Sequence, residues 1–193
     1  MFTDETSIEV QLAQPRLVRK GPEPLSSKHA AMRVKHPQKV MIWGCMSSNG
    51  FGRIHVVEGS MNSEQYTQVL RHRAAPQAAE WFQNDWIYQQ DNAPCHTSKV
   101  SKQCMADLQF NVLDWPSNSP DLNPIETVWA VLKNKLRQNT LTSKSNLIAK
   151  VLDECVRNTE RKALFDETCK KLIEGMPAII EALCKAKGDH AKF

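Results

Sequence analysis

Runs of apolar residues in the first third of the chain predict β-strands. Residues 40–46 form a continuous apolar run of strand length, which is typical of a central strand buried on both faces. A turn signal at residues 48–50, followed by a returning strand at residues 53–59, predicts an antiparallel hairpin. These two strands are the expected centre of a sheet.

The N-terminal residues predict a much shorter strand. Residues 8–12 alternate apolar and polar side chains with a period of two, which indicates a half-buried strand. Residues 4–7 are all polar and resemble a turn, so very few residues precede Asp4, whereas a typical strand has about five or six. We therefore expect Asp4 at the end of a truncated first strand.

Residues 13–39 show no clear periodicity and are interrupted by four prolines. They contain seven Lys or Arg residues against one acidic residue, Glu23. This composition suits a solvated surface loop and, alternatively, a loop that lies against phosphate groups.

The middle of the chain predicts helices that alternate with short strands. Asn62 or Ser63 caps a helix that Pro76 is expected to limit. The elements expected after it are a strand at residues 87–88, a helix from residue 97 to about 108 and a strand at residues 110–113. The strand at residues 87–88 leads directly to Asp91.

The last third predicts helices only. A strongly periodic helix begins near Pro124, with apolar residues at positions 125, 128, 129, 132 and 136. Residues 142–187 are expected to be helical, with a last helix that begins at Pro177. The order of elements predicts the α/β class, with a mixed sheet flanked by helices.

The composition favours a globular protein over a disordered or membrane-spanning one. The 193 residues, 41% hydrophobic and 24% charged, are typical of one globular domain. No apolar run is long enough to span a bilayer, so we expect no membrane partner. The six cysteines form no CxxC pair and no export signal precedes them, which favours reduced intracellular thiols in the core. The net charge of +4 permits a polyanionic partner without requiring one.

Three carboxylates lie at the edges of predicted elements: Asp4, Asp91 and Glu126. If they converge over one end of the sheet, they form a site for two Mg²⁺ ions, because Mg²⁺ prefers hard oxygen ligands and a metal pair supports phosphoryl transfer. Structural alternatives remain open for each of them. Asp4 and Asp91 suit turns, and Glu126 suits a capping box with Asn123 as the N-cap.

Other candidate sites are weaker. Cys95 and His96 do not predict a zinc site, because adjacent residues do not readily converge on one ion and no second pair has ligand spacing. His96 remains a candidate for orienting a water molecule or a phosphate near Asp91. Trp43 and Trp129 lie on apolar faces, which favours core packing over base stacking.

Four segments together resemble the catalytic domain of the Tc/mariner transposases. They are Phe2–Glu5, Val40–Gly44, Gln89–His96 and, most specifically, the proline-rich segment Trp115–Glu126. The resemblance covers nearly the whole chain and implies a ribonuclease-H-like fold. It implies that Asp4, Asp91 and Glu126 match the DDE catalytic and metal-binding triad, and the Glu at the third position resembles the Tc branch.

The resemblance also implies a reaction and partners. It implies metal-dependent cleavage of DNA at transposon ends and transfer of the freed 3′-hydroxyl into target DNA, with two Mg²⁺ ions for which Mn²⁺ may substitute. It implies a homodimer on double-stranded DNA, no small-molecule cofactor and a nuclear location. Asn92 and His96 are the expected supporting residues. The expected DNA-contacting residues are Arg33, Lys35, Lys39, Lys99 and Lys133.

Two domains are expected: a catalytic domain at residues 1–140, with its first strand truncated, and a helical extension at residues 141–193 that packs on it. The resemblance implies N-terminal DNA-recognition modules, which we do not expect in this chain because only three residues precede Asp4. One alternative is therefore a non-catalytic or domesticated remnant that binds DNA non-specifically. Another is a ribonuclease H, with Glu64 or Glu80 as an additional carboxylate.

Overall fold

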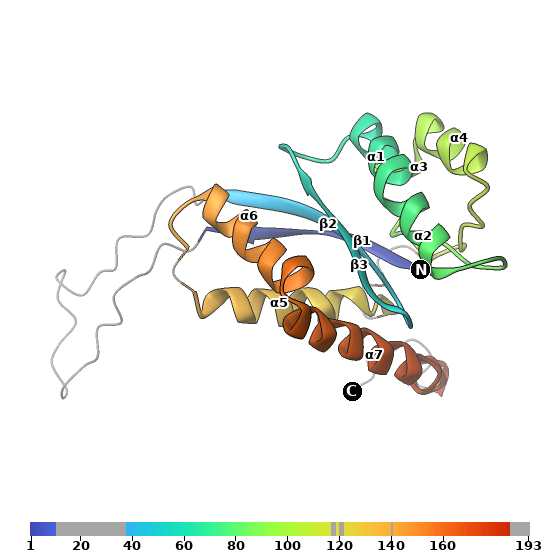
Figure 1. Ribbon diagram of the computed structural model, residues 1–193. Coiled ribbons are helices and arrows are strands. Elements are labelled where there is room, and N and C mark those ends of the chain that lie inside the picture. The colour runs from blue at the N-terminus through green and yellow to red at the C-terminus, as the bar shows by residue number, and fades with distance from the viewer. Residues whose placement is uncertain (11–37, 117–118, 120–121, 140, 186–193) are drawn as a thin grey trace, which may run out of the picture.

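A three-stranded antiparallel sheet lies at the centre of the protein. The computed structural model describes residues 1–10, 38–116, 119, 122–139 and 141–185 (Figure 1). The strands are β1 (Phe2–Glu9), β2 (Lys39–Ser47) and β3 (Gly50–Val57), in the order β1-β2-β3. Single parallel bridges, Phe2 with Gln89 and Tyr88 with Val112, add two short segments beside β1. The sheet is therefore mixed.

The predicted bounds of the first strand are wrong. β1 runs through Asp4 without a turn and pairs with β2 along its whole length, from Phe2 opposite Met46 to Glu9 opposite Lys39. Its polar residues misled the prediction because some of them are buried and bonded: Thr3 is 2% exposed, and its hydroxyl donates to the Gln89 carbonyl at 2.8 Å. A strand of eight residues is not truncated.

The antiparallel pairing of β2 and β3 confirms the predicted hairpin, although β3 begins at Gly50 rather than at residue 53 and ends at Val57. Both faces of β2 are covered, because Ile42 and Met46 belong to one hydrophobic core while Trp43 and Cys45 belong to another. Alternation along a strand sends successive side chains to opposite faces, so a strand covered on both sides has a continuous apolar sequence.

Helices cover both faces of the sheet (Figure 1). One group consists of α1 (Ser63–Val69), the π-helical turn η2 (Leu70–Ala74), α2 (Ala75–Trp81), α3 (Pro94–Thr97) and α4 (Lys99–Asp107). The other group consists of α5 (Ile125–Arg137), α6 (Lys144–Leu152), the π-helical turn η4 (Asp153–Arg157) and α7 (Thr159–Lys185). None of the helices in the described residues combines the length and apolar composition needed to cross a membrane.

The predicted helix bounds were correct in part. Asn62 caps α1 in a capping box, accepting from the Gln65 amide at 2.8 Å, as predicted. Pro76 does not limit this helix, since the chain stays helical to Trp81 after a π-helical turn that shifts the hydrogen bonding ahead of the proline. Pro177 lies inside α7 and starts no new helix.

The cysteines are free thiols. Four of the six are buried in the two cores, as expected of core residues: Cys45, Cys104, Cys155 and Cys169. Burial raises the pKa of the Cys45 thiol to about 12, which makes it an inert packing group rather than a nucleophile.

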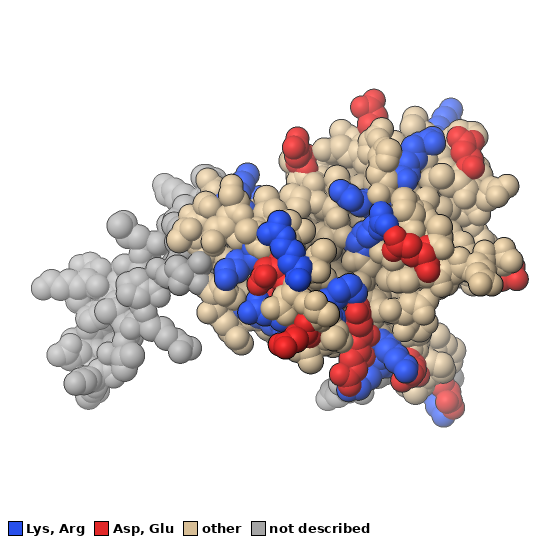
Figure 2. Space-filling model, in the orientation of Figure 1, with Lys and Arg blue, Asp and Glu red and all other residues tan. Residues whose placement is uncertain are grey.

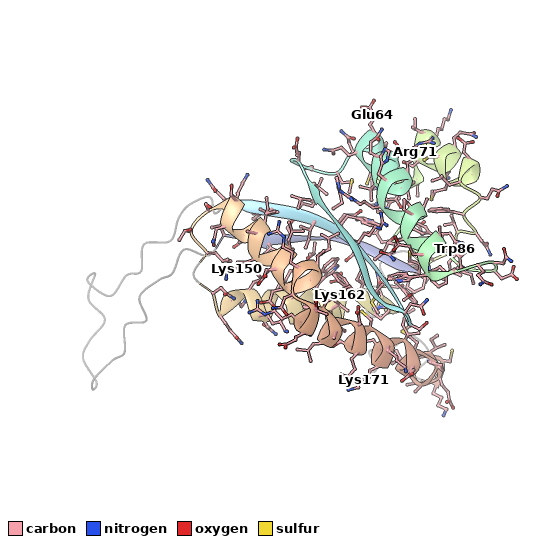
Figure 3. The ribbon with its side chains drawn as sticks, viewed as in Figure 1. Glu64, Arg71, Trp86, Lys150, Lys162 and Lys171 are labelled. Carbon is pink, nitrogen blue, oxygen red and sulfur yellow. The ribbon has the colours of Figure 1, made fainter. Side chains whose placement is uncertain are left out.

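The C-terminal helix is fastened to the β2–β3 hairpin. Asp166 of α7 accepts the Phe51 backbone N–H at 2.8 Å, and Lys162 donates both to Asp166 and to the Phe51 carbonyl. Lys162 lies where α7 passes the strands (Figure 3). Gly50 adopts a φ of +125°, and an added Cβ there would lie 2.4 Å from the Asp166 carboxylate.

Candidate active site

Asp4 sits in the middle of β1, directly opposite Gly44 of β2. The indole Nε1 of Trp129, on α5, donates a hydrogen bond to Asp4 Oδ2 at 3.0 Å. Gly44 makes this contact possible, because a Cβ at that position would lie 2.6 Å from the Trp129 ring. Trp129 is fully buried, as the apolar pattern predicted, but it also orients Asp4 through a bond that the pattern did not reveal.

Glu126 is an exposed residue in the first turn of α5. The alternative role of Glu126 in a capping box is wrong: α5 has Pro124 as its N-cap and no side-chain cap bond. The Asn123 Oδ1, which was expected to cap the helix, is buried without a partner among the described residues. The side chain of Glu126 is therefore not engaged in capping.

Asp4 and Glu126 interact electrostatically. Burial raises the pKa of Asp4, and the negative charges of Glu126 and Glu5 raise it further, to about 7. A carboxylate pair that lacks a neighbouring cation is costly, because like charges disfavour ionisation. Glu126 lies three residues before Trp129 on α5, about one helical turn from the residue that binds Asp4.

Asp91 follows a short segment that pairs with the start of β1. Phe2 of β1 bridges Gln89 in a parallel arrangement, and the Gln89 N–H donates to the Met1 carbonyl at 2.9 Å. Asp4 and Asp91 each lie two residues beyond this bridge, so both follow the point at which the two segments pair. The sequence did not reveal this pairing, because the second segment forms a single bridge.

Asp91 is held by the short helix that follows it. Its Oδ1 accepts the Ala93 N–H at 3.0 Å and faces His96 Nδ1 at 2.8 Å. The hydrogen bond with His96 is the main cause that lowers the pKa of Asp91. Half of the Asp91 side chain is exposed, so it remains open to a ligand.

His96 is buried between two carboxylates. Its Nε2 lies 3.2 Å from Glu5 Oε1, and its ring packs on Tyr66 with centroids 4.1 Å apart. Burial lowers the pKa of His96, but the hydrogen bonds and charges of Asp91 and Glu5 outweigh it and raise the pKa to about 9. Glu5 is a site residue that sequence reasoning missed, although it directly follows Asp4 in the strand.

Asn92 supports the site through its backbone and its amide. It adopts a left-handed φ of +64°, which Asn tolerates better than most residues. Its Nδ2 donates to the Trp115 carbonyl at 2.7 Å. Asn92 therefore ties the Asp91 turn to the start of the segment that leads to Glu126. Residues 117, 118, 120 and 121 of that segment lie outside the described residues.

The three carboxylates suit a divalent cation by their chemistry, although their side chains are not gathered around one point. Within the described part of the chain, no three His, Cys, Asp or Glu side chains are grouped so as to hold a metal ion. Asp4 and Glu126 are coupled by charge, whereas Asp91 is bonded to His96. Carboxylate oxygens are ligands that Mg²⁺ prefers, so the chemistry of these residues fits the expected metal.

The structure describes three of the five predicted DNA-contacting residues: Lys39, Lys99 and Lys133. Arg33 and Lys35 lie outside the described residues. Lys39 pairs with Glu9 at 3.2 Å, whereas Lys99 and Lys133 line two different hollows. Basic and acidic side chains are mixed over the face in Figure 2, with no continuous basic area.

The carboxylates proposed for a ribonuclease H lie elsewhere. Glu64 is exposed at the start of α1 and labelled at the tip of that helix in Figure 3. Glu80 is exposed on α2 and pairs with Arg53. Their described contacts do not include Asp4 or Asp91.

Comparisons with known proteins agree on one family. The model of the DDE superfamily endonucleases matches residues 1–148. The transposase of element Tcb1 from Caenorhabditis briggsae is 31% identical over 175 residues, which cover 88% of this chain and 62% of the relative. The Tc1 transposase of Caenorhabditis elegans is 32% identical over 172 residues, which cover 87% of this chain and 60% of the relative. The chain thus spans about three fifths of the length of these relatives.

Solved structures confirm the fold. The Mos1 transposase paired-end complex with the left transposon end matches 98% of this chain and 55% of that chain, with a TM-score of 0.79 and 22% identity. The catalytic domain of Mos1 mariner transposase matches 98% of this chain and 83% of that chain, with a TM-score of 0.68 and 19% identity. The expected ribonuclease-H-like α/β fold is therefore confirmed. This chain belongs to the DDE superfamily of endonucleases and corresponds to the catalytic domain of the Tc/mariner transposases.

Proposed function

We propose that this protein cuts DNA strands at transposon ends and joins the freed ends to target DNA, with Asp4, Asp91 and Glu126 as its catalytic carboxylates. The observation that carries the proposal is the parallel bridge between Phe2 of β1 and Gln89, because Asp4 and Asp91 each lie two residues beyond it. Glu126 is the proposed third member, because it lies one turn before Trp129 on α5, whose indole binds Asp4.

The three carboxylates are the proposed ligands of two Mg²⁺ ions, for which Mn²⁺ can substitute. Solved structures of the Mos1 catalytic domain contain Mg or Mn, which supports a divalent metal in this chain. Bound metal would supply the positive charge that activates an attacking oxygen and stabilises a leaving oxygen. The protein's own part is to orient the carboxylates: Trp129 holds Asp4, and His96 holds Asp91.

Double-stranded DNA, as transposon end and target, is the proposed substrate and partner. The Mos1 structures include a paired-end complex and a strand transfer complex, which supports DNA as the partner and a dimer as the assembly. Lys99 and Lys133 remain candidate phosphate contacts, because salt-dependent contacts with phosphates account for much of DNA affinity.

A strand-transfer assay tests the proposal. The purified chain is incubated with a pre-cleaved duplex end, a target plasmid and Mg²⁺ or Mn²⁺. We expect joined product from the wild type, and only background product from Asp4→Asn, Asp91→Asn and Glu126→Gln. Glu160→Gln, at an exposed position at the start of α7, is the matched control and should retain activity.

The outcomes separate the candidate functions. Salt-dependent DNA binding without any product from the wild type would favour the non-catalytic remnant. Cleavage of RNA–DNA hybrids in preference to duplex DNA would favour a ribonuclease H. Equal product from Asp91→Asn and the wild type would exclude the proposed site.

A further inference from the structure

His96 connects two carboxylates, and only one of them belongs to the proposed triad. The His96 side chain is 3% exposed, with Nδ1 2.8 Å from Asp91 Oδ1 and Nε2 3.2 Å from Glu5 Oε1. The Tyr66 ring lies against the imidazole, with centroids 4.1 Å apart and planes inclined by 32°. Both ring nitrogens and one ring face are therefore engaged, so the imidazole has no freedom to turn.

Glu5 reaches this histidine because of its place in β1. Successive side chains of a strand point to opposite faces, so Asp4 and Glu5 diverge. Asp4 meets Trp129 on the face covered by α5, whereas Glu5 meets His96 of α3. The Glu5 side chain is 14% exposed and its only described side-chain partner is His96.

The bond from His96 determines how Asp91 presents its carboxylate. Oδ1 receives both the Ala93 N–H and His96 Nδ1, whereas Oδ2 has no hydrogen bond among the described residues. Two partners on one oxygen fix the plane of the carboxylate, so the second oxygen has a defined direction. Any group that holds the imidazole therefore also holds the free oxygen of Asp91.

We propose that Glu5 is a positioning residue for the site, which acts through His96 to hold Asp91 in its metal-binding orientation. The inference rests on the proposed function, because it assigns Glu5 a role toward a proposed metal ligand. Groups that support a ligand in this way typically change metal affinity or activity about 10- to 100-fold when they are removed. One strand then organises two triad members: Asp4 directly and Asp91 through Glu5.

The test compares three variants of β1. Glu5→Ala removes the anchor of His96, and we expect Mn²⁺ affinity and strand-transfer rate each to fall about 10- to 100-fold. Glu5→Gln keeps the side-chain length and an oxygen acceptor for His96 Nε2, so it should restore most of both. Glu9→Ala is the matched control, because Glu9 lies on the same strand but pairs with Lys39 at the surface.

A readout that needs neither metal nor activity isolates the positioning role. In metal-free protein, Glu5→Ala should shift the NMR resonances of the His96 ring nitrogens and of the Ala93 amide, whereas Glu9→Ala should leave them in place. Glu5→Ala combined with His96→Gln should lose no more Mn²⁺ affinity than His96→Gln alone, because residues that act as one unit are not additive.

Other results would contradict the role proposed for Glu5. Wild-type Mn²⁺ affinity and unshifted Ala93 resonances in folded Glu5→Ala would overturn the inference, as would fully additive losses in the double variant. If Glu5→Ala unfolds, Glu5→Met, which keeps the side-chain length but removes the oxygen acceptor, replaces it in the same Mn²⁺, NMR and His96→Gln comparisons. An inactive wild type would contradict the proposed function alone, because the Mn²⁺ and NMR comparisons still report on Glu5.

Discussion

At the residue scale, a glycine, a tryptophan and an aspartate form one unit. Gly44 pairs with Asp4 across the sheet, and the Trp129 ring occupies the space that a side chain at position 44 would fill. The ring then donates to Asp4. The lack of a Cβ at Gly44 therefore matters for the position of the carboxylate as well as for packing.

Substitution of this glycine should disturb both stability and the site. Gly44→Ala would place a Cβ 2.6 Å from the rigid Trp129 ring, so the ring must move and its bond to Asp4 must lengthen. We expect a loss of about 1–3 kcal/mol in the free energy of unfolding, as for other overpacked cores. Urea denaturation measures the loss, and the strand-transfer assay should show a parallel fall in rate.

The control is a glycine at which an added Cβ would contact no other atom. Gly175 lies inside α7 and an added Cβ would meet nothing within 4 Å. Gly175→Ala should therefore stabilise the protein, by about 0.5–1 kcal/mol, because alanine is the better helix former. A Gly44→Ala variant as stable as the wild type would show that Trp129 can shift without cost.

Asn92 allows backbone and side-chain effects to be separated. Asn92→Gly keeps the left-handed φ of +64° but loses the bond to the Trp115 carbonyl, whereas Asn92→Ala also strains the backbone. The left-handed conformation costs a residue with a Cβ roughly 1–2 kcal/mol. We expect Asn92→Ala to be less stable than Asn92→Gly by about that amount in urea denaturation. The opposite order would mean that the turn does not require this conformation.

At the scale of elements, α7 is attached to the β2–β3 hairpin by side-chain bonds to its backbone. The Phe51 N–H donates to Asp166, and Lys162 binds both the Phe51 carbonyl and Asp166. The Phe51 ring packs against Phe165 of α7, with centroids 5.8 Å apart. The helix thus stabilises the hairpin whose first strand carries Gly44.

Removal of the acceptor should loosen this attachment. Asp166→Ala leaves the Phe51 N–H without its partner, and we expect a loss of about 1–3 kcal/mol in the free energy of unfolding. Glu167→Ala is the adjacent control, since its pair with Lys171 is exposed and should contribute nothing measurable. Thermal denaturation compares the two variants. Equal midpoints would show that water replaces Asp166 at the hairpin.

At the scale of the whole molecule, the C-terminal helices contribute buried side chains to a hydrophobic core and do not merely pack on its surface. One hydrophobic core contains Ile42 of β2 and Trp129 of α5 together with Leu147, Phe165 and Cys169 from the last helices. All five are 1% exposed or less. Burial of this kind is the main source of folding free energy, so the predicted boundary at residue 140 divides one core.

A truncated chain tests whether the C-terminal helices are needed for this core. We expect a chain that ends at residue 140 to lack a cooperative thermal transition, because it exposes the apolar face that α6 and α7 cover. The full chain should unfold in a single transition that is the same by far-UV and near-UV circular dichroism. Cooperative unfolding of the truncated chain would establish residues 1–140 as an independent domain.

Elements were predictable where the local pattern and the burial agree. The apolar run at residues 40–46 and the spacing of Ile125, Val128 and Trp129 both reported the true strand and helix. β1 was not predictable, because Thr3 and Thr6 are polar residues buried in a strand. Pro76 and Pro177 were misread as boundaries, since proline removes one helical hydrogen bond and tertiary packing can tolerate that loss.

The sequence by itself determined the chemistry of this protein: which carboxylates it has, which family it resembles and which apolar faces must be covered. Only the tertiary structure decided how those groups meet. The parallel bridge of Phe2 with Gln89, the indole bond to Asp4 and the link from Glu5 through His96 to Asp91 all join residues more than 80 positions apart. Periodicity describes neighbours along the chain, whereas hydrogen bonds across a sheet depend on register and close packing.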